Sequence, residues 1–527
     1  MTNLEETPPR MNDQPQPTVA QLTAALPTLA VSGPLDTTVM AVTYASGDVI
    51  PGAAFVAVPG RKADGHAYIP DALARGAVLV VGEQPKPANF PADRAYAQVE
   101  DTRRELGTLS ASFYGDPSRQ MDVIGVTGTD GKTTTSSILH WLLLTAGRRV
   151  GLMSTVDVKI GAETFPNNSR FTTLEAPEVQ GQLRRMADAG VECAVVETTS
   201  SGLALHRVWG VAYDLAVITN ITSEHLEVHG SLEAYKRAKA MLFEAVDPNA
   251  PAKPIAFSAP RGCVLNADDP SCAYLKDFCR APITTYGVES QADVRAENLE
   301  LRPDGSSFTA RLPDGQTFRV ETPLVARYNV SNCLAAITVG YLRGVAPEVI
   351  ASALATFPGV PGRMERVEAG QPYMVVVDYA HTADSLEKAL SVLRPLTAGR
   401  LIVVFGSAGE RDRVKRPEMG KVAAHLADFA VITDEDPREE DAITILREIA
   451  AGAEAAGARE GERFVCVVDR RKGIQVALEM ARAGDVVLLA GKGHEQSIFV
   501  GKEKLPWDDP TVARETLAAL GYTGIRE

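Results

Sequence analysis

Short apolar runs that alternate with helical segments constrain the fold of this chain most. A run at residues 121–126 is followed by a Gly/Thr-rich loop and a predicted helix at 133–145, and further apolar runs lie at 193–196 and 215–219. The same alternation returns later, with predicted strands at 374–377, 401–405, 430–433, 464–468 and 486–490 and a helix at 384–393. Strands that alternate with helices indicate a parallel sheet covered by helices. The sequence therefore predicts an α/β protein whose second unit is also doubly wound.

A smaller α/β region precedes the two alternating regions. Apolar runs at 53–58 and 77–81 enclose a predicted helix at 69–75. A turn-rich segment at 114–118 ends this region, and another at 358–362 begins the last one. We expect domains at residues 18–118, 119–358 and 359–527. Residues 1–17 are polar and Pro-rich, which predicts a disordered leader, and the sequence leaves open whether translation starts at Met1 or Met11.

Composition narrows the class of protein. The net charge is -14, which argues against a protein that coats nucleic acid, because such binding needs many Lys or Arg contacts to phosphate. No apolar run approaches the ~18 residues of a membrane helix, and the polar residues at 1–17 predict that this segment is not a signal peptide. The six cysteines form no C-x-x-C pair, so free thiols in a reducing compartment are favoured. We expect a soluble, cytoplasmic monomer that acts on small molecules.

The loop after the first central strand has the character of a phosphate site. It reads Gly-Val-Thr-Gly-Thr-Asp-Gly-Lys-Thr-Thr from residue 125 to 134. Its backbone N–H groups and the N-terminus of the following helix can surround phosphate oxygens, while Lys132 reaches the terminal phosphates and Thr133 offers a hydroxyl to Mg²⁺. Val126 replaces the first glycine of the usual pattern. ATP binding is predicted, and a turn that binds nothing is the alternative.

Two polar residues at the ends of predicted strands are candidates for a second Mg²⁺ site. Glu197 follows the run at 193–196, and His225 follows the run at 215–219. The carboxyl ends of parallel strands carry the ligand sites of α/β proteins. Mg²⁺ prefers oxygen ligands, so hydrogen bonding is the alternative role of His225.

The predicted helix at 231–243 places a lysine on its apolar face. Ser231 is a plausible N-cap, and Lys239 falls four residues after Tyr235 and seven after Leu232. Burial lowers the pKa of a lysine, and a neutral amine can take up CO₂ as a carbamate, which is a metal ligand. Snorkelling to solvent and an ion pair with Glu197 are the alternatives.

A series of motifs resembles the Mur ligases of peptidoglycan synthesis, from about Val42 to the C-terminus. Within that family the chain is most similar to the members that add the third residue of the stem peptide. The motifs are Gly-Thr-Asp-Gly-Lys-Thr-Thr at 128–134, Thr-Asn-Ile-Thr-Ser-Glu-His-Leu at 219–226, Leu-Asn-Ala-Asp-Asp at 265–269, Tyr-Asn-Val-Ser-Asn at 328–332, Gly-Arg-Met-Glu at 362–365, Asp-Tyr-Ala-His-Thr at 378–382, Gly-Glu-Arg-Asp at 409–412, Lys-Arg-Pro at 415–417 and Gly-Lys-Gly-His-Glu at 491–495.

The resemblance implies an N-terminal UDP-binding domain, a central P-loop ATPase domain and a C-terminal Rossmann-like domain. It also implies a reaction. ATP converts the carboxylate of UDP-N-acetylmuramoyl-L-alanyl-D-glutamate into an acyl phosphate, and the amine of a diamino acid displaces phosphate. Mg²⁺ and Lys132 would stabilise the negative charge that develops. Most of the remaining rate acceleration would come from holding the reactants in the correct geometry.

The resemblance further implies roles for single residues. The catalytic group is Lys132, Lys239, His225 and Glu197, and the metal ligands are Thr133, Glu197, His225 and carbamylated Lys239. ATP would contact Gly128, Thr129, Asp130, Gly131, Lys132, Thr133, Thr134, Asn266, Asn332, Arg363, Asp378 and His381. The UDP-muramoyl dipeptide would contact Ser46, Thr172, Thr173, Ser200 and Arg207, and the incoming amino acid Arg411, Asp436, Arg438, Gly491 and Glu495.

One departure from the family pattern concerns the amino acid. Family members that add meso-diaminopimelate read Asp-Asn-Pro-Arg where this chain reads Glu435-Asp436-Pro437-Arg438. An ionised Asp436 only accepts hydrogen bonds, so it would repel a distal carboxylate and suit an ammonium group. This predicts lysine or ornithine. Arg438 is retained and pairs well with carboxylates, unless it pairs with Asp436 or Glu435, so diaminopimelate is the alternative.

Other departures and other classes stay open. Ala45-Ser46-Gly47 stands where the family has Asp-Ser-Arg near the uridine, so only Ser46 is retained there. A folylpolyglutamate-synthase-like ligase shares the phosphate loop but lacks the long N-terminal domain. A nucleotide switch without ligase activity would leave the motifs of the last domain without a role.

Overall fold

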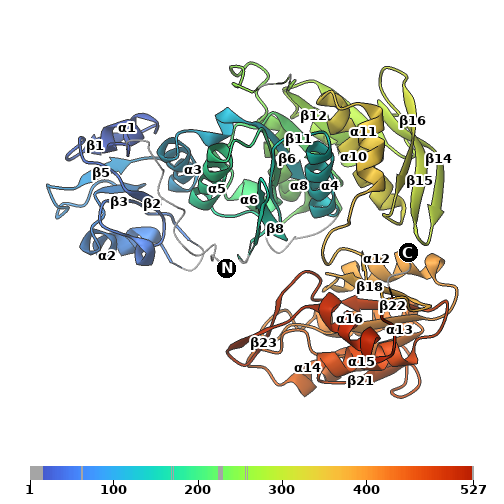
Figure 1. The fold of residues 1–527 in the computed structure, drawn as a ribbon. Coiled ribbons are helices and arrows are strands. Elements are labelled where there is room, and N and C mark those ends of the chain that lie inside the picture. The colour runs from blue at the N-terminus through green and yellow to red at the C-terminus, as the bar shows by residue number, and fades with distance from the viewer. Residues whose placement is uncertain are drawn as a thin grey trace. The chain divides into compact units, whose positions relative to one another are not determined.

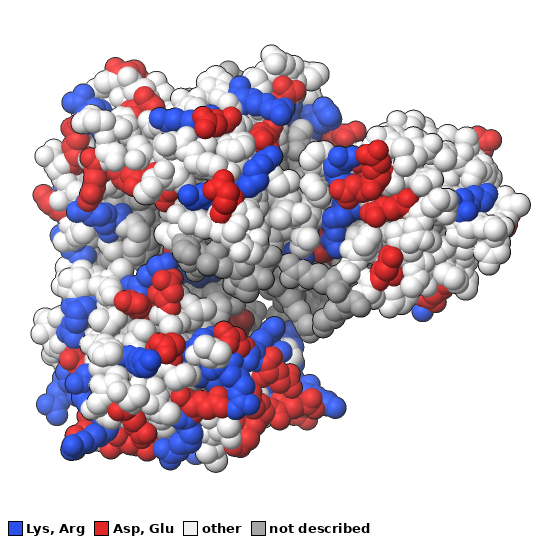
Figure 2. All heavy atoms as spheres, turned by 180° about the vertical axis from the view of Figure 1, so that it is seen from behind, with Lys and Arg blue, Asp and Glu red and all other residues white. Residues whose placement is uncertain are grey.

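The computed structural model describes residues 16–60, 63–167, 169, 171–222, 229–255, 257 and 259–524. The chain forms two compact units, and the boundary between them falls between Phe357 and Pro358 (Figure 1). In the part of the chain that the structure describes, no helix is both long and apolar enough to cross a membrane. Acidic and basic side chains are interspersed over the face seen in Figure 2.

The N-terminal part of the first unit is a small sheet with the strand order β1-β5-β4-β3-β2. Strands β2 to β5 are parallel, and β1 is antiparallel to β5. The strands are β1 (Ala30–Ser32), β2 (Ala41–Thr43), β3 (Ala53–Val56), β4 (Leu79–Gly82) and β5 (Ala95–Gln98). The helices are α1 (Val19–Ala24), α2 (Ile69–Ala74) and α3 (Thr102–Phe113), with short 3₁₀ turns η1 (Ser46–Asp48), η2 (Gly65–Tyr68) and η3 (Pro117–Gln120).

The rest of the first unit is built on an 11-stranded sheet with the order β16-β15-β14-β13-β12-β11-β6-β10-β7-β8-β9. Strand β6 pairs in parallel with β10 and β11, so their carboxyl ends meet at one edge. The strands are β6 (Asp122–Thr127), β7 (Val150–Met153), β8 (Asp157–Ile160), β9 (Glu163–Pro166), β10 (Cys193–Glu197), β11 (Leu215–Ile218), β12 (Gly262–Asn266), β13 (Ile283–Gly287), β14 (Val294–Arg302), β15 (Gly305–Arg311) and β16 (Thr317–Thr322).

Helices pack on this sheet and complete its core. Helix α4 packs against β6, β7 and β10 and against α10, while α8 packs against α6 and β6. Gly125 in β6 makes room for α8, because a Cβ there would lie 2.7 Å from Leu242. The helices are α4 (Lys132–Thr145), α5 (Ala176–Asp188), α6 (Ser200–Ala204), α8 (Leu232–Glu244), α9 (Ser271–Lys276), α10 (Arg327–Leu342) and α11 (Pro347–Ala355).

The second unit contains a six-stranded sheet with the order β17-β18-β22-β19-β20-β21 and a separate hairpin, β23-β24. Strands β18 to β22 are parallel, as Val- and Ile-rich strands buried on both faces tend to be. The strands are β17 (Glu365–Arg366), β18 (Met374–Asp378), β19 (Leu401–Phe405), β20 (Phe429–Ile432), β21 (Phe464–Cys466), β22 (Val486–Ala490), β23 (Ser497–Val500) and β24 (Glu503–Pro506). The helices are α12 (Ala383–Leu393), α13 (Lys415–Leu426), α14 (Ala442–Ala455), α15 (Arg470–Met480) and α16 (Asp509–Ala519), with η4 (Arg394–Leu396).

The predicted α/β fold class is confirmed. The predicted strands at 401–405 and 486–490 coincide with β19 and β22, and the helix predicted from Ser231 is α8, with Ser231 as its N-cap. One prediction on α8 was wrong. Leu232 is 37% exposed, because it occupies the first turn, beyond the buried part of the apolar face. The domain boundaries that we expect at 118 and 358 stay predictions.

Candidate active site

The phosphate loop connects β6 to α4 in a strained conformation that only glycine tolerates. Gly128 has φ +151° and Gly131 has φ +80°. A Cβ on Gly128 would lie 1.8 Å from Thr219 Oγ1, and one on Gly131 would lie 2.4 Å from Asn332 Oδ1. Lys132 Nζ donates to Thr129 O at 2.7 Å. The first-turn N–H groups of α4 and this ammonium group are the donors that a phosphate requires.

Neighbouring strand ends hold this loop in place. Asp130 donates its N–H to Asn220 Oδ1 at 3.0 Å, and Thr129 Oγ1 lies 3.0 Å from Tyr235 Oη. Thr134 is the third residue of α4, directly after Thr133. The predicted ATP contact Asn266 ends β12 and donates to Thr219 O at 2.7 Å. The loop is therefore held by the segment after β11 and by α8, which are distant from it in the sequence.

Glu197 lies at the carboxyl end of β10, where it accepts from Thr133. Thr133 Oγ1 donates to Glu197 Oε1 at 3.0 Å, and Thr155 donates both its N–H (2.8 Å) and its Oγ1 (3.0 Å) to the same carboxylate. Glu197 is 1% exposed. A buried carboxylate beside a hydroxyl is an oxygen donor set that fits Mg²⁺. The predicted ligand His225 lies outside the described residues.

Lys239 is buried, as the helix pattern predicts. Its side chain is 1% exposed, and Nζ donates to the carbonyl oxygen of Gly128 at 2.6 Å while lying 4.3 Å from the centre of the Tyr235 ring. Snorkelling to solvent is therefore excluded. The contact joins α8 directly to the phosphate loop.

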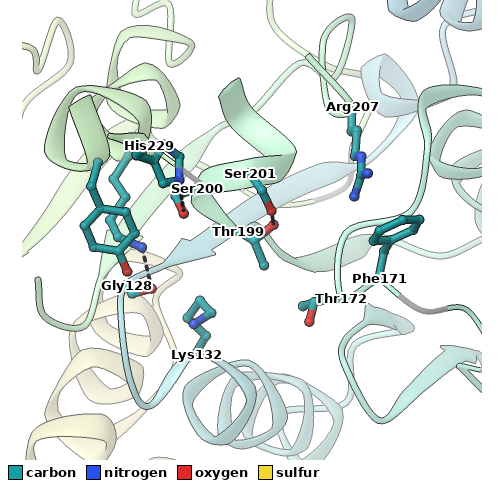
Figure 3. A pocket seen from close by; sticks show the side chains of 11 residues that line it. Gly128, Lys132, Phe171, Thr172, Thr199, Ser200, Ser201, Arg207 and His229 are labelled. Atoms are coloured by element: carbon teal, nitrogen blue, oxygen red, sulfur yellow. Dashed lines mark hydrogen bonds between the residues drawn. The ribbon is translucent and has the colours of Figure 1, made fainter. Parts of the chain in front are cut away.

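A pocket of about 250 Å³ opens beside this loop (Figure 3). Gly128 and Lys132 lie on one side of it, and Arg207 and Phe171 on the other. Six predicted site residues line it: Gly128, Lys132, Thr172, Ser200, Arg207 and Lys239. Sequence reasoning missed Phe171, Thr199, Ser201, His229 and Tyr235 as lining residues. The pocket thus brings predicted phosphate contacts and predicted muramoyl-dipeptide contacts together.

The missed residues mostly orient the predicted ones. His229 Nε2 lies 3.1 Å from Ser200 Oγ, and Thr173 Oγ1 lies 3.0 Å from Thr199 Oγ1. Tyr235 had a signal, since it lies four residues before Lys239 on the apolar face. Thr199 and Ser201 had none, because their role depends on the turn into α6, where Thr199 is the N-cap.

Arg207 is held by an ion-pair chain. Its Nη2 lies 2.9 Å from Glu175 Oε1, and Glu175 Oε2 in turn pairs with Arg103 of α3 at 3.2 Å. Its guanidinium carbon lies 4.0 Å from the centre of the Phe171 ring, and its Nε has no hydrogen-bond partner among the described residues. Arg207 is 6% exposed, so its orientation is set by these contacts. Ser46, another predicted contact of the UDP-muramoyl dipeptide, lies in the 3₁₀ turn η1.

Two of the three predicted ATP contacts of the second unit, Arg363 and His381, contact Tyr379, and the third, Asp378, precedes it in the chain. Arg363 lies 4.9 Å from the Tyr379 ring, and His381 Nδ1 lies 2.8 Å from Tyr379 O. Asp378 accepts the N–H groups of Met364 and Ala380 at 2.9 and 3.0 Å. Burial raises the pKa of Asp378, although Arg363 opposes the shift. Asp378 ends β18 and His381 follows it, whereas Arg363 comes just before β17.

Among the residues predicted to hold the amino acid, Asp436 already has a partner. Lys492 Nζ lies 2.9 Å from Asp436 Oδ1 and 2.6 Å from Glu495 Oε2, and Lys492 is fully buried. In this structure Asp436 accepts from a lysine of the same unit, and its contact with a ligand ammonium group stays a prediction. Arg411 is exposed, in the loop before α13.

Three family models match the chain in sequence order. They are described as Mur ligase family, catalytic domain (residues 38–114), Mur ligase middle domain (126–340) and Mur ligase, glutamate ligase domain (362–493).

Relatives match over nearly the whole length. A UDP-N-acetylmuramyl-tripeptide synthetase of Roseiflexus sp. is 49% identical over 93% of this chain and 97% of its own. A UDP-N-acetylmuramoyl-L-alanyl-D-glutamate--2,6-diaminopimelate ligase of Geobacillus thermodenitrificans is 41% identical over 90% and 94%. A solved structure of a ligase with the latter name is 29% identical, with a TM-score of 0.67, over 96% of this chain and 100% of that one.

Proposed function

The chain belongs to the Mur ligase family of ATP-dependent, amide-forming ligases, and from this we propose that it adds a diamino acid to UDP-N-acetylmuramoyl-L-alanyl-D-glutamate in peptidoglycan synthesis. One observation carries the proposal. Lys132 of the phosphate loop and Arg207, a predicted contact of the muramoyl dipeptide, line the same pocket. The relatives that share nearly the whole length carry names for this reaction.

The reaction begins at the substrate carboxylate, which is a poor electrophile because oxide would have to leave. Transfer of the γ-phosphoryl group of ATP to a carboxylate oxygen gives an acyl phosphate and ADP. The amine of the incoming amino acid then attacks the acyl carbon, phosphate leaves, and the amine loses a proton. Each step develops negative charge on oxygen, so placed cations and N–H donors lower its barrier.

This chain supplies those donors. The N–H groups of the first turn of α4 and the ammonium group of Lys132 would bind the terminal phosphates. Thr133 and Glu197 would hold Mg²⁺, which when bound neutralises phosphate charge. Lys239 would act beside them, either as an amine that orients the loop through Gly128 or as a carbamate. Ser200, Thr172 and Arg207 would hold the muramoyl dipeptide.

The amino acid that we propose is lysine or ornithine, with meso-diaminopimelate as the alternative. Three carboxylates, Glu435, Asp436 and Glu495, lie around Gly491 and one lysine, Lys492, which pairs with Asp436 and Glu495. The negative charge in excess of that single lysine favours a ligand that carries an additional ammonium group. Arg438 supplies one cation for a carboxylate.

The decisive experiment measures phosphate release together with the mass of the peptide product. A ligase should release phosphate only when ATP, UDP-muramoyl dipeptide and an amino acid are all present, and the product mass identifies which amino acid was added. Lys132→Ala should abolish both signals. Phosphate release that is indifferent to both acceptors would instead support a nucleotide switch.

A further inference from the structure

The turn between β7 and β8 carries a threonine that the sequence patterns did not identify. Thr155 follows β7 at its carboxyl end, and β7 pairs in parallel with β10, which in turn pairs with β6. Glu197 ends β10, and the phosphate loop follows β6. The carboxyl ends of three adjacent strands therefore bring Thr155, Glu197 and the phosphate loop to one edge of the sheet.

Thr155 contacts both oxygens of the Glu197 carboxylate. Its backbone N–H donates to Oε2 at 2.8 Å, and its hydroxyl lies 3.0 Å from Oε1 and 3.1 Å from Oε2. Thr133, at the start of α4, also donates to Oε1, at 3.0 Å. Glu197 is 1% exposed, so these bonds and not solvent set the rotation of its carboxylate.

The same hydroxyl contacts the side of the pocket that we expect to hold the muramoyl dipeptide. Thr155 Oγ1 lies 3.0 Å from Oγ1 of Thr172, which lines the pocket (Figure 3). Of the residues that the structure describes, Thr155 is not one of those that line it. A hydroxyl has one proton and two lone pairs, so Thr155 can serve both partners. It connects a predicted metal ligand with a predicted substrate contact.

Further hydrogen bonds keep this turn in one conformation. Ser154 Oγ accepts the backbone N–H groups two and three residues farther on, at 3.2 and 3.1 Å, which closes the turn locally. Asn167 Nδ2 donates to Ser154 O at 2.9 Å and to Phe171 O at 3.2 Å. The turn is thus tied to the segment of Thr172 at two points, the amide of Asn167 and the hydroxyl of Thr155.

We propose that Thr155 is a positioning residue whose hydroxyl holds the Glu197 carboxylate and the Thr172 hydroxyl in one arrangement, so that the metal side and the dipeptide side of the pocket are set together. The inference rests on the proposed function, because that function gives Glu197 and Thr172 their roles. It adds that one hydroxyl outside the pocket lining controls both dipeptide binding and the rate of the chemical step.

The test compares Thr155→Val, which removes the hydroxyl and keeps the backbone N–H, with Thr155→Ser, which keeps the hydroxyl. In calorimetric titrations without Mg²⁺ or nucleotide, Thr155→Val should weaken binding of the UDP-muramoyl dipeptide by roughly threefold to tenfold, because one ordering hydrogen bond is lost. In ligation assays it should lower kcat by about tenfold or more and raise the Mg²⁺ concentration for half-maximal rate, because Glu197 loses part of its support. Thr155→Ser should keep all three values within about twofold of the wild type.

Thr172→Val separates the two sides of the pocket. It should weaken dipeptide binding and leave the Mg²⁺ dependence unchanged, since Glu197 keeps its contacts with Thr155. Thr155→Val combined with Thr172→Val should bind the dipeptide no more weakly than Thr172→Val alone, because both changes break the same contact. Additive losses of affinity would overturn the link through Thr172, and an unchanged kcat and Mg²⁺ dependence in Thr155→Val would overturn the link to Glu197.

Thr164→Val, on exposed strand β9, is the matched control and should change none of these values. Circular dichroism and thermal melting establish that each variant is folded. Thr155→Ala removes the same hydroxyl and takes the place of Thr155→Val if the latter does not fold.

The binding and ligation measurements separate this inference from the proposed function. An active wild type whose Thr155→Val variant behaves like it would contradict the inference and leave the function standing. Dipeptide binding that Thr155→Val weakens and Thr155→Ser keeps, without any ligation, would support the contact with Thr172 and contradict the proposed reaction. Neither binding nor ligation by the wild type would overturn both.

Discussion

The ε-amino group of Lys239 donates to the carbonyl oxygen of Gly128 across 2.6 Å, which ties helix α8 to the phosphate loop. The two residues are 111 positions apart in the sequence. Both lie in the same unit and line the same pocket. The contact places a buried amine where β6 ends and the phosphate loop begins. Substitution of either residue should therefore alter nucleotide binding.

Lys239→Ala should lower the ligation rate by at least about a hundredfold, because it removes a placed charge or carbamate from a buried site. Lys236→Ala on the same helix is the control, since Lys236 lies off the buried face. Intact-mass measurement in bicarbonate should show the added mass of one CO₂ on the wild type and none on Lys239→Ala. Full activity of Lys239→Ala would contradict a role for this residue.

Gly128→Ala should abolish ATP binding. The added Cβ would lie 1.8 Å from Thr219 Oγ1 at a backbone conformation that side chains rarely adopt, so the loop must move. Gly147→Ala is the matched control: Gly147 also has a positive φ, but nothing lies within 4 Å of its Cβ position. The control should retain nucleotide affinity and lose about 1 kcal/mol of stability. Equilibrium binding of a labelled ATP analogue measures the difference.

Arg103→Ala should raise the KM for the UDP-muramoyl dipeptide by roughly threefold to tenfold, while the KM for ATP stays the same. The reason is that Arg103 holds Glu175, and Glu175 holds Arg207 at the pocket. Arg119→Ala, which breaks an exposed pair with Asp116, is the control. Equal rises in both KM values would show that the chain does not act through Arg207.

Stability should fall in mild acid because of His140. Burial is the main cause that lowers the pKa of His140 to about 4, with the charge of Lys159 as a smaller cause. The unfolded chain therefore binds the proton more tightly, so the contribution is complete above the ordinary pKa of 6.5 and is lost as the pH falls toward 4. His140→Leu should reduce this acid-dependent loss by about 3 kcal/mol. Urea denaturation at several pH values tests it, and parallel curves for the two proteins would contradict the prediction.

Lys492→Met should destabilise the second unit by about 3–5 kcal/mol, because it leaves the carboxylates of Asp436 and Glu495 without their buried partner. Adding Asp436→Asn to this variant should recover part of the loss, which gives a coupling energy of at least about 1 kcal/mol. Lys502→Met breaks a surface pair and should change stability by less than about 0.5 kcal/mol. Additive effects of Lys492→Met and Asp436→Asn would show that the pair does not interact.

Much of the fold could be predicted because buried parallel strands are short, continuous apolar runs. β19 and β22 were predicted to the residue, and the strand–loop–helix around Lys132 was predicted within one residue at each end. Strands β14 and β15 were not predicted. β14 has many partly exposed positions, and its pairing with neighbours depends on residues far along the chain.

The candidate site was predictable in part for the same reason. Glu197 ends an apolar run, and Lys239 lies on a periodic apolar face, so local pattern identifies both. Thr155 and His229 carry no such signal. Thr155 contacts Glu197 and His229 contacts Ser200, and both partners are distant in the sequence.

The sequence by itself determined the family, the α/β class and the set of groups available to bind phosphate, because residue type and short-range spacing encode these properties. Only the tertiary structure decided which charges remain for a ligand. Asp436 and Glu435 are neighbours with nearly the same chemistry, yet Lys492, 56 residues after Asp436, pairs with Asp436, whereas Glu435 Oε2 has no hydrogen-bond partner among the residues that the structure describes. Charge pairing in a buried site depends on distances of a few ångströms between distant residues, and no local pattern specifies those distances.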